Sequence, residues 1–280
     1  MFGKVINGAK AWITIKGLSF QPSELTKLSL AIMLSDLAGK FKSTGIKSEF
    51  IFLLKVAILI LIPSVLVFLE PDSGAIIFFL VITLAILIFS DIHKFWFTIV
   101  FILIALFIGG FILLYLYNKD LLINLIGTSF FYRVERLITF KTMSSYQLEN
   151  ALVAMGSSSL LGTGLGKVSL YIPEAPTDFI FAFSISNFGY LCGFIILSCY
   201  FLMDLFLINK IINMKKNTLK YILISFTSIF LFGQIINIGM NLGLLPIIGI
   251  PLPFLSYGGS TLIIYFTFLS IIFNSFEKSY

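Results

Sequence analysis

Long apolar runs recur along this chain of 280 residues and restrict its possible folds more than any other feature. The run from Ser73 to Ser90 contains no charged residue, and neither does the run from Phe95 to Tyr117. A helix needs about 20 apolar residues to cross roughly 30 Å of hydrocarbon, since each residue adds about 1.5 Å. Strands of a membrane barrel would instead alternate apolar and polar residues. The chain is therefore predicted to be an all-α, polytopic integral membrane protein.

We predict about seven transmembrane helices in a single domain that covers residues 1–280. They run from Glu24 to Ala38, Phe50 to Leu69, Ser73 to Ser90, Phe95 to Tyr117, Phe179 to Ile208, Leu219 to Ile238 and Thr261 to Asn274. Composition agrees, because 59% of the residues are apolar and only 11% are charged, against about 25% charged in soluble domains.

Lysines gather in three short connections between these spans. The lysines of the first are Lys40, Lys42 and Lys47, that of the second is Lys94, and those of the third are Lys210, Lys215, Lys216 and Lys220. The three connections lie on one side of a seven-span path, which the positive-inside rule makes cytoplasmic. Orientation in the membrane thus explains the net charge of +6, and no nucleic-acid partner is expected.

The opposite, outer side then receives a large extracytoplasmic loop over residues 118–178 and an irregular segment from Asn237 to Thr261. A loop this long is usually functional. Glycines and prolines interrupt the second segment, and broken backbone at membrane depth survives only where protein buries it or where it lines a cavity. We predict a re-entrant wall of an outward-facing cavity. Met1 would also lie outside, without an apolar signal segment, so we expect an odd number of further spans upstream.

The sequence "YIPEAPTDFIFAF" places two acids beside the start of a long apolar run. Thr177 or Asp178 could cap the helix that begins at Phe179, because such side chains satisfy free backbone N–H groups. Alternatively, a half-desolvated Asp178 would have a raised pKa and could take a proton from an incoming hydroxyl. Glu174 could orient the substrate or be solvated. The residues alone leave both functions of Asp178 open.

Two further polar groups lie at predicted helix ends. In "FQPSELTKL", Pro22 suits a first helical turn and Ser23 could cap, while Glu24 and Lys27 share one helix face. A charged pair at the end of a membrane helix indicates a functional site, although an ion pair that only holds the helix is an equal alternative. Asp72 in "EPDSGA" begins a span, so a helix cap competes there with a role in the site.

Other motifs carry less information. The "GTGLG" motif, residues 162–166, lacks the Lys and Ser/Thr of a phosphate-binding loop, and a flexible outer turn is expected instead. Arg133 and Arg136 could clamp a phosphate or rest on lipid headgroups. His93 receives no role, and a chain with one histidine cannot form a Ser/His/Asp triad or a His-based zinc site. No metal-binding residues are predicted.

The chain resembles the SEDS proteins, the group that includes RodA, FtsW and SpoVE, which build bacterial cell-wall glycan. The matching motifs stand here as "NGAKAWI", "FQPSELTKL", "EPDSGA", "YRVERLITF", "YQLENALVAMGSSSLLGTGLG", "PEAPTDFIFA" and "NIGMNLGLLPIIGIPLPFLSYGGS". They follow one another over nearly the whole chain. The family usually has about ten spans, and the match begins at the outer loop before the fourth.

The resemblance implies a peptidoglycan glycosyltransferase of the outer membrane leaflet. An acceptor hydroxyl would attack the anomeric carbon of lipid II with inversion and expel polyprenyl diphosphate, for cell elongation or division. Asp178 in "TDFIFA" would be the catalytic base. Candidate substrate-binding residues in the matched motifs are Glu24, Lys27, Asp72, Arg136, Gln147, Glu174, Thr177, Asn237 and Ser256. A divalent cation could assist at the diphosphate, although no ligand cluster stands out.

The resemblance also implies partners and a location. The partners would be a class B penicillin-binding protein, which is a transpeptidase, and other elongasome or divisome membrane proteins, in the bacterial cytoplasmic membrane with the active site facing outward. A lipid II flippase and a non-catalytic scaffold are the alternatives. The chain departs from the family at Ser186 and Asn187, where two acids commonly precede the Gly that is Gly189 here.

Overall fold

Seven long helices form the body of the protein in a computed structural model that describes residues 4–6, 9–15, 18–70, 72–128, 131, 135, 146–165 and 170–277. These helices are α1 (Pro22–Lys40), α2 (Ile46–Leu69), α3 (Ser73–Phe89), α4 (Lys94–Tyr117), α8 (Ile180–Asn213), α9 (Thr218–Asn241) and α10 (Gly259–Glu277). Each coincides with a predicted span, and α8 continues past the predicted end at Ile208. The prediction of a polytopic helix bundle is confirmed.

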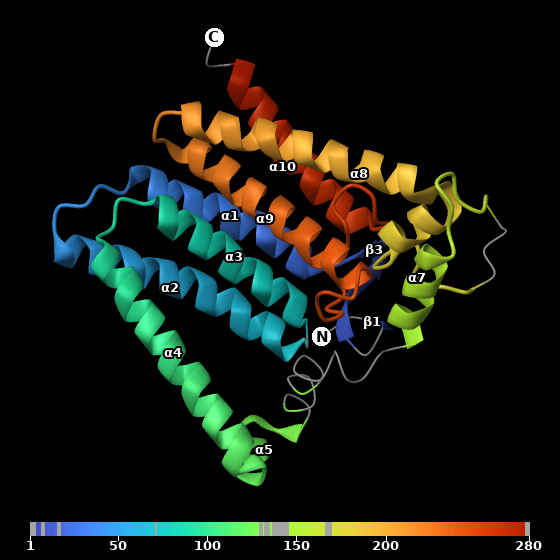
Figure 1. Cartoon of the computed structure of the whole chain (residues 1–280). Coiled ribbons are helices and arrows are strands. Elements are labelled where there is room, and N and C mark those ends of the chain that lie inside the picture. The colour runs from blue at the N-terminus through green and yellow to red at the C-terminus, as the bar shows by residue number, and fades with distance from the viewer. Residues whose placement is uncertain are drawn as a thin grey trace.

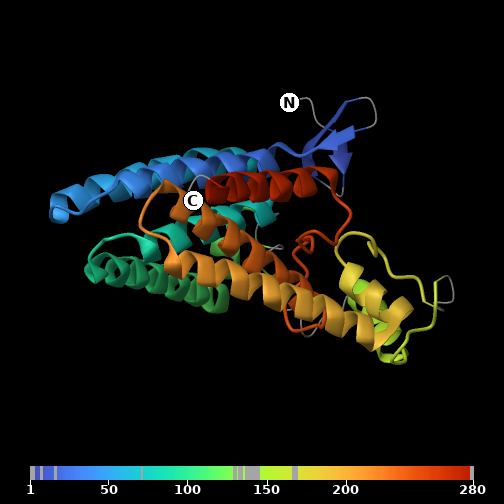
Figure 2. The same ribbon diagram turned by 90° about the horizontal axis from the view of Figure 1, so that it is seen from above.

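Helix α9 lies at the centre of the bundle, between α1 and α3 on one side and α8 and α10 on the other (Figure 1). Its aromatic side chains fill the core, where Phe226 and Phe230 stack and both contact the ring of Tyr265 from α10. Within the described residues, α2, α4, α8 and α9 are long and apolar enough to cross a membrane, while α3 and α10 contain shorter apolar stretches. Figure 2, seen from above, shows the long helices running along a common direction.

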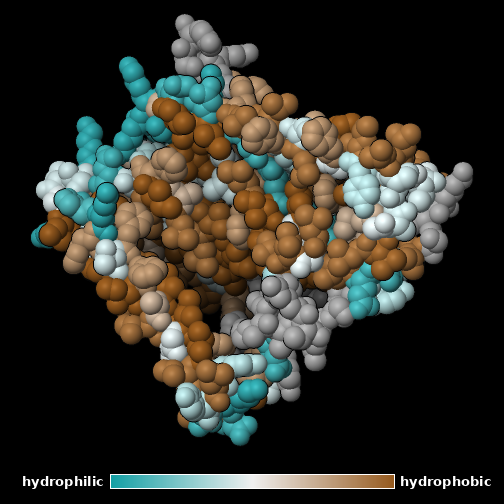
Figure 3. Space-filling view, viewed as in Figure 1, coloured by the Kyte–Doolittle hydropathy of each residue, from teal (hydrophilic) through white to brown (hydrophobic). Residues whose placement is uncertain are grey.

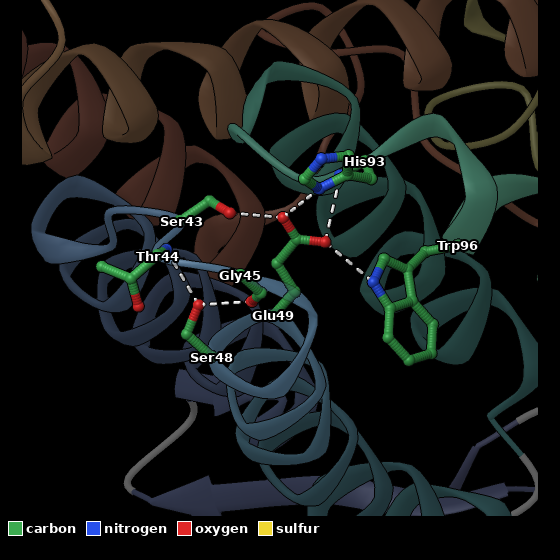
Figure 4. Close-up of polar contacts among 7 residues, drawn as sticks. All are labelled: Ser43, Thr44, Gly45, Ser48, Glu49, His93 and Trp96. Atoms are coloured by element: carbon green, nitrogen blue, oxygen red, sulfur yellow. Dashed lines mark hydrogen bonds and ion pairs between the residues drawn. The ribbon is translucent and has the colours of Figure 1, made fainter.

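Helix α4 diverges from the bundle, so that its far end and the short α5 (Lys119–Ile126) stand apart (Figure 1). Its near end is tied to α2 through Glu49, which is fully buried (Figure 4). Nδ1 of His93 lies 2.5 Å from Oε1 of Glu49, and the Trp96 indole N–H donates to the other carboxylate oxygen at 2.9 Å. The hydroxyl of Ser43 also donates to Glu49. His93, to which the sequence assigns nothing, thus belongs to a polar anchor of α4.

The end of the bundle that carries the predicted outer loops has more structure than the sequence indicates. Three strands form an antiparallel sheet in the order β1 (Lys4–Ile6), β2 (Ala9–Ile15), β3 (Leu18–Phe20), which was not predicted. The described part of residues 118–178 contains α5 and α7 (Tyr146–Gly156) rather than loop alone. Helix α7 packs against α8. Burial of Leu148 and Ala151 against the bundle explains why this segment is helical.

Helix α8 is broken at Gly189, whose φ of 85° and ψ of 175° are almost exclusive to glycine. Carbonyl groups freed by the break accept from the "GTGLG" segment, since Thr163 N–H donates to Ser186 O at 3.2 Å and Gly164 N–H to Asn187 O at 3.0 Å. The expected outer turn is therefore docked on α8 instead of flexible. The N–H groups of Gly162, Thr163 and Gly164 all donate to backbone carbonyls and cannot cradle a phosphate.

Hydrophobic side chains cover the middle of the face seen in Figure 3, and hydrophilic ones gather towards its edges. We call the end that carries the α1–α2, α3–α4 and α8–α9 connections the basic end, because it holds the lysines of these connections. The opposite end holds the sheet, α7 and the irregular segment after α9. Asp178, Asp72 and Gln21 all lie at this opposite end, where α8, α3 and α1 begin.

Candidate functional site

A cavity of about 150 Å³ lies at the end of the bundle opposite the basic end. Its polar lining includes Gln21, Glu24, Lys27, Asp72, Thr177 and Asp178. Residues far apart in sequence meet here because α1, α3 and α8 all begin beside it. The irregular segment after α9 closes one side with Gly249, Ile250 and Pro251, as the predicted re-entrant wall requires.

Asp178 precedes α8, but neither it nor Thr177 caps that helix, whose N-cap is Phe179 without a side-chain hydrogen bond. The capping alternative therefore fails. The side-chain amides of Asn237 and Asn241 donate to the backbone carbonyl of Asp178 at 3.0 and 2.9 Å. These two hydrogen bonds hold the backbone of Asp178 against α9. Burial raises the pKa of the Asp178 carboxyl to about 6, and the charge of Glu174 adds to this rise. A carboxyl of this kind is suited to accept a proton near neutral pH.

Glu24 and Lys27 lie one turn apart on α1, both almost completely buried, with Nζ of Lys27 2.5 Å from Oε1 of Glu24. Nζ also lies 4.3 Å from the centre of the Phe78 ring, in a cation–π contact. The ammonium group carries three donors. It can therefore keep its ion pair and still donate to an anion in the cavity.

Asp72 combines the two roles that the sequence leaves open. Its Oδ1 accepts from the N–H of Ala75 at 3.2 Å and thereby caps α3. Its Oδ2 accepts from Gln21 Nε2 at 2.7 Å and from the Ser23 hydroxyl at 2.8 Å. Ser23 thus donates to Asp72 instead of capping α1, while Pro22 begins that helix as predicted. The carboxylate joins the starts of α1 and α3 at the cavity.

The segment before α8 is held by the irregular segment after α9. The hydroxyl of Ser256 donates to Thr177 O at 2.6 Å, and the N–H of Tyr257 donates to Pro176 O at 2.8 Å. Thr177 itself donates to a carboxylate oxygen of Glu174 at 3.0 Å. Glu174 is exposed and does not line the cavity, so it acts on Asp178 through its charge.

The other predicted site residues are distributed differently. Asn237 and Ser256 are buried behind the cavity wall, where they position backbone instead of facing a ligand. Gln147 lies on α7 and does not line the cavity. Arg133 and Arg136 lie outside the described residues. The sequence did not single out Trp12 and Tyr257, which line the cavity, although both belong to the quoted motifs "NGAKAWI" and "FLSYGGS".

Ser186 and Asn187 lie at the break of α8, about 1% exposed. Among the described residues, Ser186 Oγ and Asn187 Oδ1 have no hydrogen-bond partner. Buried polar atoms are usually paired, so these two are exceptions. The backbone carbonyls of Ser186 and Asn187 accept from the "GTGLG" segment, and neither residue lines the cavity that holds Asp178.

Within the described residues, no group of three or more His, Cys, Asp and Glu side chains could hold a metal ion. Asp72, Glu24 and Asp178 line one cavity from three helix ends but do not form such a group. The cavity therefore offers carboxylates and one ammonium group, an arrangement for proton transfer and for binding an anion.

Comparisons with known proteins identify the family of this chain. The family model described as "Cell cycle protein" for FtsW, RodA and SpoVE matches residues 1–279. The probable peptidoglycan glycosyltransferase FtsW of Wigglesworthia glossinidia brevipalpis is 34% identical over 98% of this chain and 71% of its own length. That of Buchnera aphidicola subsp. Baizongia pistaciae is 36% identical over 94% and 68%.

A solved structure of a peptidoglycan synthase complex that coordinates polymerization and crosslinking superposes with a TM-score of 0.70 at 25% identity. The match covers 96% of this chain and 74% of that chain. Sequence and fold lead to the same conclusion. This chain belongs to the FtsW/RodA/SpoVE family.

Proposed function

We propose that this protein is a peptidoglycan glycosyltransferase that polymerises lipid II at the outer face of the bacterial cytoplasmic membrane. The observation that carries the proposal is the carboxyl group of Asp178, half-buried in a cavity that also holds Lys27. Relatives at 34% and 36% identity bear the name of a probable peptidoglycan glycosyltransferase. Because both are named FtsW, a role in division is favoured over one in elongation.

Asp178 would act as the general base. Its carboxylate takes the proton of an acceptor sugar hydroxyl while the oxygen attacks the anomeric carbon of the donor. A new glycosidic C–O bond forms on one face of the sugar, and the C–O bond to polyprenyl diphosphate breaks on the other, which inverts the anomeric centre. A pKa of about 6 keeps most of the carboxyl groups deprotonated at neutral pH, yet basic enough to bind a proton.

Lys27 would stabilise the leaving diphosphate. The buried ammonium group is held in place by Glu24 and Phe78 before any substrate binds. Preorganised charge of this kind costs no reorganisation when negative charge develops, which makes it effective in catalysis. Arg136, which precedes α7 in the sequence, could contribute a second cation, and a divalent cation could share the task.

The proposed partner is a class B penicillin-binding protein, with other divisome or elongasome membrane proteins beside it. The structural neighbour belongs to a complex that couples polymerization to crosslinking, and a transpeptidase would supply the second activity here. Co-purification of a tagged copy with a transpeptidase of this class would test the partnership.

The decisive experiment replaces Asp178 by Asn. We expect no glycan polymer from purified lipid II, while the variant still inserts, folds and binds its partner. Asp120→Asn, which changes an acid on α5, is the matched control and should polymerise normally. Polymer formation by Asp178→Asn at the wild-type rate would exclude this residue as the base. If the protein instead flips lipid II, flipping by Asp178→Asn should persist, and the wild type should make no polymer.

A further inference from the structure

A second cavity lies at the basic end of the bundle, between α1 and α2. Its volume is about 650 Å³. It is remote from Asp178, because α1 lines the first cavity near its start, at Glu24 and Lys27, and the second near its end, at Lys40. Nothing in the proposed reaction uses it. Its lining residues flank the α1–α2 connection, which lies at the left edge of Figure 1.

Positive charge outnumbers negative charge in the lining of this cavity. Lys40, Lys42 and Lys55 all line it, and the one acid in its lining, Asp36, forms an exposed ion pair with Lys40 at 2.6 Å. Within the described part of the chain, neither Lys42 nor Lys55 has an ion-pair partner. Ser48 adds a hydroxyl to the lining. The unbalanced charges favour an anionic ligand.

Lys55 is the residue that the positive-inside rule does not explain. It lies inside a span, about 13 Å along α2 from Ile46, at roughly 1.5 Å per residue. A lysine at that depth is expensive unless its side chain reaches towards the headgroups or meets an anion. Lys55 lines the same cavity as Lys42 and Lys40.

The remaining lining is apolar and leads towards the middle of the membrane. It consists of Met33 and Leu37 of α1, Phe41, and Ile51, Phe52 and Leu59 of α2. The rings of Phe41 and Phe52 stack with their centroids 4.1 Å apart. Met33 and Ile51 are exposed. A free phosphate ion would contact only the lysines of the cavity lining. A ligand with a phosphate head and an acyl tail would use the whole cavity.

We propose that the cavity between α1 and α2 binds an anionic phospholipid of the cytoplasmic leaflet, with the phosphodiester at Lys42 and Lys55 and an acyl chain along the apolar lining. Basic pockets between transmembrane helices on the cytoplasmic side are typical sites for anionic headgroups. The bound lipid would fasten α1, which carries Glu24 and Lys27, to α2. The proposal does not depend on the glycosyltransferase activity.

Delipidated full-length protein tests the proposal through its thermal unfolding midpoint. Added dioleoylphosphatidylglycerol should raise the midpoint saturably, whereas dioleoylphosphatidylcholine or inorganic phosphate should not, because a ligand stabilises only the state that it binds. Each lysine near the headgroup contributes about fivefold in affinity, so Lys42→Gln/Lys55→Gln should weaken binding roughly 25-fold.

Two further variants make the result specific. Lys47→Gln/Lys215→Gln removes two exposed charges at the same end but outside the cavity, and it should bind like the wild type. Lys42→Arg/Lys55→Arg keeps the charges and should also bind. Equal effects of both lipids, or equal losses in the two glutamine double variants, would overturn the proposal. A shift produced by inorganic phosphate alone would indicate an ion site instead of a lipid site.

Discussion

The side-chain amide of Asn237 on α9 donates to the backbone carbonyl of Asp178 at 3.0 Å and, through the same nitrogen, to the carbonyl of Ile250 at 2.8 Å. A single fully buried residue thus joins the start of α8 to the opposite wall of the cavity. The position of the proposed base depends on a residue that does not face the substrate.

Asn237→Leu should therefore reduce both stability and polymerisation. The Ile250 carbonyl would lose this donor, and the Asp178 carbonyl would keep Asn241 but lose one of its two side-chain donors. A buried group left unsatisfied costs about 1–3 kcal/mol. Thermal unfolding and lipid II polymerisation, measured on the same preparation, give the two effects. Asn213→Ala is the control, because that side chain bonds only Asn209 within its own helix. A Leu variant with wild-type activity would show that Asn237 does not position Asp178.

The raised pKa of Asp178 predicts a pH profile. Since the base must be deprotonated, polymerisation should increase as the pH rises through about 6 and level off above it. The negative charge of Glu174 contributes to the raised pKa, so Glu174→Gln should lower the pKa and move the acidic limb to lower pH. Rates of the variant and the wild type, measured between pH 5 and 8, provide the test. An acidic limb that does not move would show that Glu174 exerts no charge effect on the base.

The buried pair of Glu24 and Lys27 predicts a difference between single and double variants. Lys27→Met leaves the Glu24 charge buried without its partner, which costs about 3–5 kcal/mol when such a pair is broken. Glu24→Gln/Lys27→Met removes both charges and should regain most of that stability without regaining polymerisation. Thermal midpoints and polymer yield distinguish the two effects. Full activity of the double variant would mean that the pair only holds α1.

The break in α8 predicts a strong effect of one methyl group. A Cβ atom on Gly189 would lie 2.1 Å from the carbonyl oxygen of Leu160, and the backbone conformation there is one that side chains rarely adopt. Gly189→Ala should lower the thermal midpoint, because the "GTGLG" segment could no longer pack against the break in α8. Gly109→Ala in α4 meets nothing within 4 Å and should be neutral. Equal midpoints for the two variants would contradict this reading of the break.

The anchor of α4 predicts a local effect at the basic end. Glu49→Gln replaces a carboxylate oxygen that accepts hydrogen bonds with an amide that donates them, opposite His93 and Trp96. Hydrogen bonds to charged groups contribute about 1.5–3 kcal/mol each. Hydrogen exchange in residues 93–98 should accelerate, while exchange in α9 should not change. Asp36→Asn, at an exposed ion pair, is the control and should leave both regions unchanged.

The local pattern of apolar residues determined much of this protein. The longest spans, which became α2, α4, α8 and α9, can be identified by themselves, because the cost of exposing backbone to hydrocarbon enforces a helix whatever its neighbours are. The lysines in the short connections identified the basic end of the bundle without any knowledge of the packing. The acid at Asp178 could be nominated from its place beside a span, and the resemblance carried by the motifs gave it a role.

Tertiary structure alone decided how these parts meet. The cavity is lined by Gln21, Asp72, Asp178 and Gly249, which no local sequence pattern connects. The packing of the helix ends also determined that Asp72 caps α3 and that Asp178 does not cap α8. The break at Gly189 and the Glu49 anchor also depend on partners distant in sequence. Hydrophobic periodicity reports which residues avoid water, but the packing of helix ends determines which polar groups face one another.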